Sequence, residues 1–246
     1  MNQSTNRRSR LASFALWAGV LAIVLPVLGG LGTRLGIWFY GVGVLLVPLG
    51  LLLGITGLVL GPIALLRQRK AGESLVFAAS GTGFSALGTL YLGGVMLSGF
   101  MVPAIHNVST DIEDPPEFTM AASLRGEGAN PLFYDSETIG PVQREGYPDL
   151  GPLDIDMPRD EAYELVRGVL VDMGLELARE APEQGEIEAV ATTFWFGFKD
   201  DLVVRLRETD AGTRMDVRSV SRVGIGDLGA NAERIFEIIG RVRDAR

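Results

Sequence analysis

The chain has 246 residues, of which 22 are Lys or Arg, 30 are Asp or Glu and none is Cys, and its net charge is −8. Without cysteine the protein cannot use a thiolate nucleophile, a cysteine-ligated zinc ion or a disulfide. The charges are unevenly distributed. Residues 1–102 contain seven basic residues and one acid, Glu73, whereas residues 103–246 contain 15 basic and 29 acidic residues. So acidic a second part repels nucleic acid and anionic lipid headgroups, which disfavours DNA binding and docking of this part on a membrane surface.

Three long uncharged segments occupy the first part of the chain, at residues 11–33, 35–66 and 74–110. Because about 20 apolar residues cross the hydrocarbon core of a bilayer, each segment predicts one transmembrane helix, and residues 1–105 form a three-helix transmembrane anchor. Small residues recur on one stripe of the second segment, which predicts close helix packing: Gly50, Gly54, Gly57 and Gly61. The cores of the three segments lack charged residues, which disfavours a transport pathway.

The distribution of basic residues predicts the orientation of this anchor. They gather before the first segment and after the second: Arg7, Arg8, Arg10, Arg67, Arg69 and Lys70. The loop between these segments has only Arg34. Because basic loops stay in the cytoplasm, we expect a cytoplasmic N-terminus and a periplasmic C-terminal domain in the cell inner membrane.

Residues 106–157 are rich in Pro, Gly and acidic residues and show no sustained helical or strand period. We therefore expect an extended, loop-like segment that lies along the domain that follows. Asp111, Glu113, Asp114 and Glu117 are close together in it, but they lack the turn glycine and spacing of a calcium loop. A solvated acidic segment is the preferred interpretation, and no metal or other cofactor is predicted.

Residues 158–246 predict an α+β domain, an antiparallel sheet with helices packed on one face. A helix begins near Pro158 and stops near Gly174, and strands are expected at 186–198, 201–208 and 213–222. The turn at residues 210–212 makes the second and third strands a hairpin. A last helix is expected from Asp227, with an apolar stripe: Leu228, Ala232, Ile235, Ile239 and Val242.

Several stretches resemble the domain-of-unknown-function family 1499. The most specific of them is the block from Asp216 to Arg234, supported by Phe198–Asp201, Asn107–Asp111 and Pro115–Pro116. The resemblance covers about residue 106 to the C-terminus. It implies a place in bacterial membranes or chloroplast-type compartments, in agreement with the predicted anchor, and it implies no established activity.

The candidate ligand or partner site lies in and near this block: Arg218, Ser221, Arg222, Asp227, Asn231, Arg234, Asp200 and Asp201. Two interpretations are open. A helix N-terminus beside two arginines and a serine is suited to binding an anion. The preferred interpretation is an internal salt-bridge network that holds the last helix to the sheet, with Asp227 as the helix cap. Alternation along the strand places Arg218 and Arg222 on one face and Ser219 and Ser221 on the other.

The sequence contains no catalytic motif that we can assign, and no catalytic residue is predicted. The single histidine, His106, directly follows the third apolar segment, where we expect it to pack near the membrane. Two functions remain. The first is a non-enzymatic envelope protein whose domain assists or scaffolds a protein partner in the membrane or periplasm. The second is a module that binds a lipid or other small ligand in an apolar cleft between helix and sheet, lined by residues such as Trp195 and Phe198.

Overall fold

A computed structural model describes residues 9–245, which divide into two compact units. The first unit contains the membrane helices, and the second, which begins at Gly99, contains the α+β domain. Arg7 and Arg8, which contribute to the predicted orientation, lie outside the described residues.

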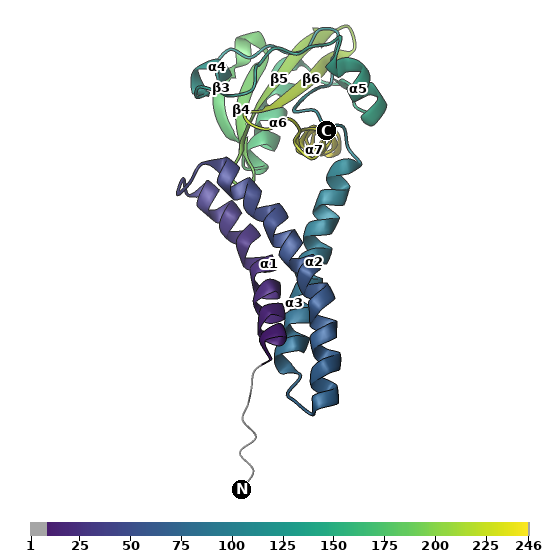
Figure 1. Cartoon of the computed structure of the whole chain (residues 1–246). Helices are drawn as coiled ribbons and strands as arrows, with labels where there is room; N and C mark the ends of the chain where they lie inside the picture. The colour runs from purple at the N-terminus through teal and green to yellow at the C-terminus, as the bar shows by residue number, and fades with distance from the viewer. Residues whose placement is uncertain (1–8, 246) are drawn as a thin grey trace. The chain divides into compact units, whose positions relative to one another are not determined.

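Three helices long and apolar enough to cross a membrane form the anchor (Figure 1), as predicted. They are α1 (Arg10–Arg34), α2 (Tyr40–Ala71) and α3 (Val76–Phe100). The four glycines of the predicted stripe are all buried in α2. A Cβ on Gly57 would collide with Ser85 Oγ of α3, and one on Gly50 would lie 2.8 Å from Pro26 Cδ of α1. The stripe therefore lets the helix backbones approach closely.

The second unit is built on an antiparallel sheet with the strand order β1-β6-β5-β4-β3, in which β2 also pairs with β6. The strands are β1 (Asn107–Ser109), β2 (Leu153–Ile155), β3 (Glu176–Ala181), β4 (Glu186–Thr192), β5 (Lys199–Thr209) and β6 (Gly212–Ser221). The predicted hairpin is confirmed, because Thr209 pairs with Gly212 across the turn. β1, β2 and β3 were not predicted.

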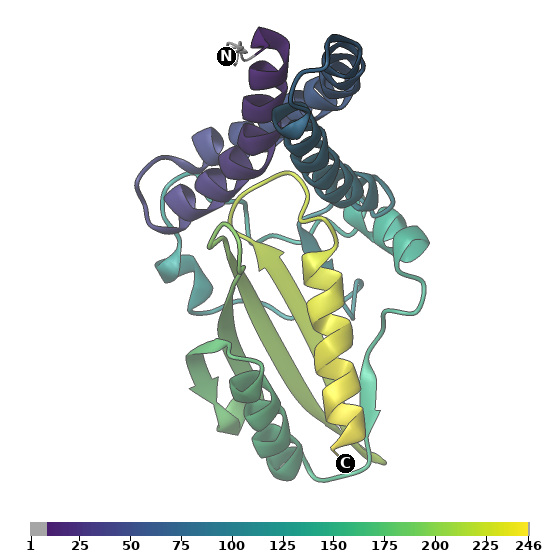
Figure 2. The same cartoon turned by 90° about the horizontal axis from the view of Figure 1, so that it is seen from below.

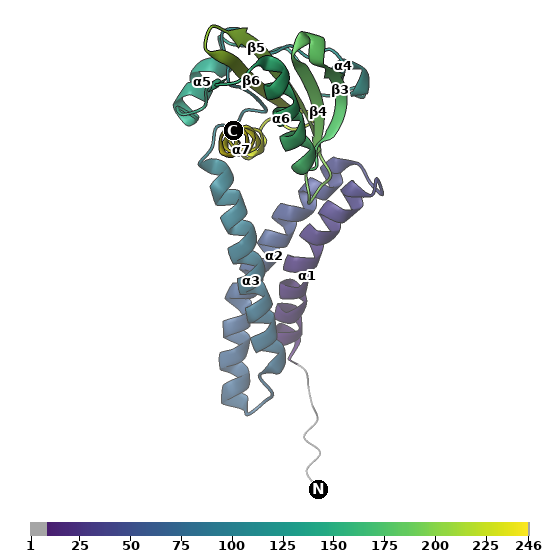
Figure 3. The same ribbon diagram turned by 180° about the vertical axis from the view of Figure 1, so that it is seen from behind.

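Two helices pack on one face of this sheet, α6 (Arg159–Asp172) and α7 (Ala230–Asp244). Figures 2 and 3 show both helices on the same side of the strands. The core between these helices and the sheet consists of side chains that are completely or almost completely buried. Those from α6, β5 and α7 include Val166, Leu170, Leu202, Val204, Leu206, Ile235, Ile238 and Val242. The alternation along β5 and the helical period of α6 and α7 together produce this core.

The last helix begins later than predicted. It starts at Ala230 rather than Asp227, because Leu228 has a left-handed backbone with φ of +56° and cannot belong to the helix. Leu228 is 62% exposed and is not part of the apolar stripe that α7 buries. The rest of that stripe, Ala232, Ile235, Ile239 and Val242, is buried as expected.

The first long strand is shorter than predicted. β4 ends at Thr192, because the next six residues close a loop that returns the chain to β5. In that loop the Phe198 N–H donates to Thr193 Oγ1 at 2.9 Å, and the Thr193 N–H donates to Phe198 O at 2.8 Å. A run of apolar residues alone does not distinguish a long strand from a strand followed by a tight loop.

The chain between β1 and β2 crosses the face of the sheet opposite α6 and α7 (Figures 1 and 3). It contains two short helices, α4 (Ala121–Leu124) and α5 (Ile139–Gly146). Together with its two flanking strands, the region expected to be extended is thus an integral part of the sheet domain. Its backbone polar groups find partners on the sheet, which is the condition for an irregular segment to be buried.

Candidate functional site

The eight candidate residues separate onto the two faces of the sheet, because neighbouring strand residues point in opposite directions. Asp200 pairs with Ser221, and Asp201 with Val220, in the register of β5 and β6. Asp200 and Ser221 therefore face the helices. Asp201, Arg218 and Arg222 face the segment between β1 and β2, as the alternation in the sequence predicted for the arginines.

On the helix side, Arg234 of α7 joins the helix to two strands. Its Nη2 donates to Asp200 Oδ2 at 2.7 Å, and its Nη1 donates to Ser219 Oγ at 3.0 Å and to Asn231 Oδ1 at 2.7 Å. The side chains of Arg234 and Asp200 are 12% and 3% exposed. The ion pair is thus largely removed from water, where a charge-assisted hydrogen bond is strong.

Asn231 completes this helix-side cluster. Its Nδ2 donates to Ser221 Oγ at 2.9 Å and to the His106 carbonyl at 3.1 Å, while its Oδ1 accepts from Ser219 Oγ at 2.6 Å. Asn231 and Ser219 are fully buried. All the polar atoms of the Asn231 amide are therefore used to hold α7 against β6 and the residue before β1.

Asp227 is not the residue directly before α7, yet it stabilises the start of the helix. Its carboxylate accepts the N–H groups of Gly229 and Asn231 at 2.9 and 2.8 Å. Burial raises the pKa of Asp227 above its ordinary value, and these two N–H groups oppose the increase. Asp227 thus accepts hydrogen bonds from the start of α7, as a helix cap does, although the helix begins three residues later.

On the opposite face, Asp201 is held between two arginines. Arg125 Nε donates to its Oδ2 at 2.7 Å, and Arg222 Nη2 donates to its Oδ1 at 2.7 Å. Arg222 also donates to the Leu124 carbonyl at 2.9 Å. Asp201 is 1% exposed, and burial lowers the pKa of Arg125 while Asp201 raises it. This triad attaches the segment after α4 to β5 and β6, and Arg125 was not among the predicted residues.

Arg218 is also buried, and its hydrogen-bond partners belong to neither the Arg234 cluster nor the Asp201 triad. It is 3% exposed, and its guanidinium donates to Asn107 Oδ1 at 3.0 Å, to Pro116 O at 2.9 Å and to Leu132 O. Two rings lie near the same group, Phe118 at 5.1 Å and Tyr134 at 5.6 Å from the guanidinium carbon. Burial is the main cause that lowers the pKa of Arg218, to about 10. The cation is stabilised by oxygens and rings of the segment that covers the sheet.

Two further buried acids on this face escaped the sequence analysis. Glu188 of β4 is 2% exposed and accepts the backbone N–H groups of residues 119–121 at 2.8 to 3.0 Å. Asp216 is fully buried and pairs with Arg207 at 2.7 Å and with Arg205 at 3.3 Å. Nothing in a strand sequence distinguishes such an acid from one that faces solvent. Glu188 receives its partners from the chain that covers the sheet, whereas the partners of Asp216 lie on the neighbouring strand β5.

Of the four acids expected to be solvated, Glu113, Asp114 and Glu117 are exposed, whereas Asp111 is half-buried. Asp111 pairs with Arg207 at 3.2 Å and with Arg205 at 3.6 Å, and Asp114 pairs with the same two arginines at 3.0 and 3.2 Å. Glu113 lies on the surface and pairs with Arg144. Among residues 9–245, no group of three or more His, Asp or Glu side chains is arranged to hold a metal ion.

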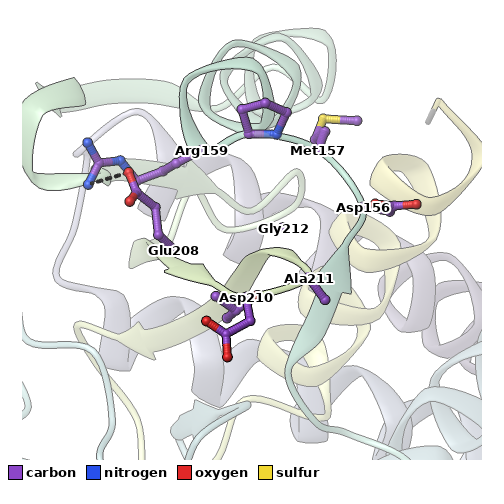
Figure 4. Close-up of a pocket in the computed structure, with 9 residues that line it drawn as sticks. Asp156, Met157, Arg159, Glu208, Asp210, Ala211 and Gly212 are labelled. Carbon is purple, nitrogen blue, oxygen red and sulfur yellow. Dashed lines mark ion pairs between the residues drawn. The ribbon is translucent and has the colours of Figure 1, made fainter.

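A shallow depression of about 600 Å³ lies at the β5–β6 hairpin (Figure 4). It is open to solvent, and its lining includes Asp156, Arg159, Glu208 and Asp210. Arg159 Nη1 lies 3.6 Å from Glu208 Oε1. The depression therefore contains none of the eight candidate residues.

The model of the family described as "Protein of unknown function (DUF1499)" matches residues 107–242. The match begins at β1 and ends within α7, so it covers the whole sheet, α6 and most of α7. Among curated proteins, none matches this chain.

Proposed function

This chain belongs to the DUF1499 family, and from that premise we propose that it is a membrane-anchored, non-enzymatic protein whose α+β domain faces the periplasm. There the domain assists or scaffolds a protein partner of the membrane or periplasm. The three long apolar helices support the anchoring part of the proposal. The inner membrane is the location that fits an anchor of this kind together with an exported domain.

All eight candidate side chains bond other groups of this chain, and this observation supports the non-enzymatic part of the proposal. Seven candidate side chains make hydrogen bonds or ion pairs that join α7 or the covering segment to the sheet, and the eighth, Asp227, bonds the start of α7. A general base or a nucleophile needs an atom that can reach a substrate. Groups that are buried and bonded to their own fold are better explained as parts that stabilise it.

The filled core argues against the alternative, a lipid or small-ligand module with a cleft under α7. The helix face toward the sheet consists of residues with almost no exposure, such as Ile235 and Ile238, which belong to the same core cluster as Val217 of β6. A drug-sized ligand needs a cavity of about 300 Å³ or more. The space between helix and sheet is occupied by side chains, so we prefer the interaction function.

Two experiments test the proposal. Reporter fusions in the cell test the orientation: a reporter active only in the periplasm should be active when fused after residue 246 and inactive after residue 70. The reverse pattern refutes the periplasmic placement. That pattern would not bear on the non-enzymatic role, which the second experiment tests.

The second experiment compares Arg222→Ala, directly after β6, with Arg214→Ala, within β6. Arg222 bonds the buried Asp201, whereas Arg214 makes an exposed pair with Asp154. If Arg222 only stabilises the fold, its variant should lose stability, and any cellular phenotype should follow the loss of folded protein in the membrane. An Arg222→Ala protein that is as stable and abundant as Arg214→Ala but inactive would refute the structural role.

A further inference from the structure

The loop between β6 and α7, residues 222–229, exposes large apolar side chains in the second unit. Ile225 is 86% exposed and Leu228 is 62% exposed. Its two charged side chains are both turned to internal partners: Arg222 bonds Asp201, and the Asp227 carboxylate accepts backbone N–H groups at the start of α7. The surface that this loop offers to its surroundings is therefore mainly apolar.

The backbone of the β6–α7 loop is fixed in this arrangement by residues far away in sequence. Asn130 Nδ2 donates to Gly224 O at 2.8 Å, and His106 Nδ1 lies 3.2 Å from Ile225 O. Leu228 has a φ of +56°, a conformation that a leucine adopts only when its surroundings impose it. Because the backbone is held at these points, the loop cannot simply fold its apolar side chains back into the core.

The same loop runs beside the chain that leaves α3. Leu228 Cδ2 lies 2.5 Å from the position that a Cβ on Gly99 would take, and a Cβ on Gly226 would lie 3.2 Å from Ala104 Cα. Gly99 is the penultimate residue of α3, whose length and composition suit a membrane span. The β6–α7 loop thus lies beside the C-terminal end of α3. Phe100, at the end of the span, is itself 82% exposed.

From this continuity with the span we propose that the β6–α7 loop inserts Ile225 and Leu228 into the lipid leaflet in which α3 ends. Apolar side chains at the boundary of the acyl chains exchange contact with water for contact with lipid, which is favourable. The loop then acts as a second, shallow contact of the domain with the bilayer. This inference holds whichever side of the membrane the domain occupies, so it is independent of the proposed function.

The opposite end of the sheet has the character expected of the end that faces water. β6 runs from Gly212, beside the hairpin, to Ser221, beside the β6–α7 loop. The hairpin end is lined by the charged residues Asp156, Arg159, Glu208 and Asp210 (Figure 4). The apolar loop and the charged hairpin thus lie at the two ends of one strand.

The absence of native cysteine makes the proposal directly testable. We would replace Ile225 by Cys in the full chain, attach an environment-sensitive fluorophore, and reconstitute the protein at low density in phosphatidylcholine vesicles. Ala211→Cys, at the exposed turn of the hairpin, is the matched control. Quenching is measured with a nitroxide attached to the lipid acyl chains, and separately with iodide present on both sides of the membrane.

We expect the lipid nitroxide to quench the label at position 225 several-fold more than the label at position 211, and iodide to give the reverse order. Equal access of iodide to both positions would overturn the proposal, because the loop would then lie in water. Shielding of position 225 from both quenchers would overturn it as well, since the loop would then be covered by protein, such as a second copy of the chain. The side chain at position 225 is almost fully exposed, so its replacement should leave the fold intact.

Discussion

Replacement of Arg218 by Ala tests most sharply whether the family-specific block supports structure or forms a site. The guanidinium is buried and bonds oxygens of three separate parts of the chain, Asn107, Pro116 and Leu132. Removing it takes away the donor that these three acceptors share. It also opens a cavity between Phe118 and Tyr134.

The expected loss follows from these contacts. A hydrogen bond to a charged group contributes about 1.5–3 kcal/mol, and three such bonds set a gross loss of at least about 4–5 kcal/mol. Removing a buried cation relieves part of its desolvation cost, and effects within one cluster are not additive. We therefore expect Arg218→Ala to lower the free energy of unfolding of the α+β domain by about 3–5 kcal/mol.

The assay is urea unfolding of the full chain in detergent, followed by circular dichroism and by hydrogen exchange of residues 107–134. Arg218→Lys keeps a positive charge, but one ammonium group cannot reach acceptors on three segments, so we expect an intermediate loss. Arg241→Ala, which breaks only an exposed pair with Glu237, serves as the control and should cost less than about 1 kcal/mol. An Arg218→Ala protein within about 1 kcal/mol of wild type would refute the reasoning.

Three further predictions concern other parts of the chain. Glu188→Gln places an amide donor against the N–H groups of residues 119–121, so it should lower the free energy of unfolding by about 2–4 kcal/mol and speed hydrogen exchange at these residues. Unchanged exchange would contradict this role of Glu188. Because burial raises the pKa of Asp227, the folded chain binds its proton at higher pH than the unfolded chain does. Wild type should therefore gain stability relative to Asp227→Asn as the pH falls from about 7 to about 4, measured by urea midpoints, and parallel pH profiles would exclude this effect. Gly57→Leu should lower the thermal stability of the anchor in detergent, whereas Gly83→Leu, where a Cβ meets open space, should not, and equal melting of the two variants would show that the stripe does not pack.

The sequence by itself determined the features that depend on neighbouring residues. Uncharged runs longer than a bilayer requires predicted three spans, and three helices of suitable length and composition are present. Alternation along the strand placed Arg218 and Ser219 on opposite faces, and the turn at 210–212 predicted the hairpin. A period of two or 3.6 residues follows from local backbone geometry, which explains why these predictions were correct.

Only the tertiary structure decided which polar groups meet. Glu188 finds its N–H partners 67 to 69 residues away along the chain, and Arg218 finds Leu132 86 residues away. No local pattern encodes such pairs. The left-handed backbone at Leu228, which delays the start of α7, likewise belongs to a loop held by the distant Asn130 and His106. The chain specifies its helices and strands locally, but a buried charge is tolerable only where a distant segment covers and bonds it, so its role becomes visible only after folding.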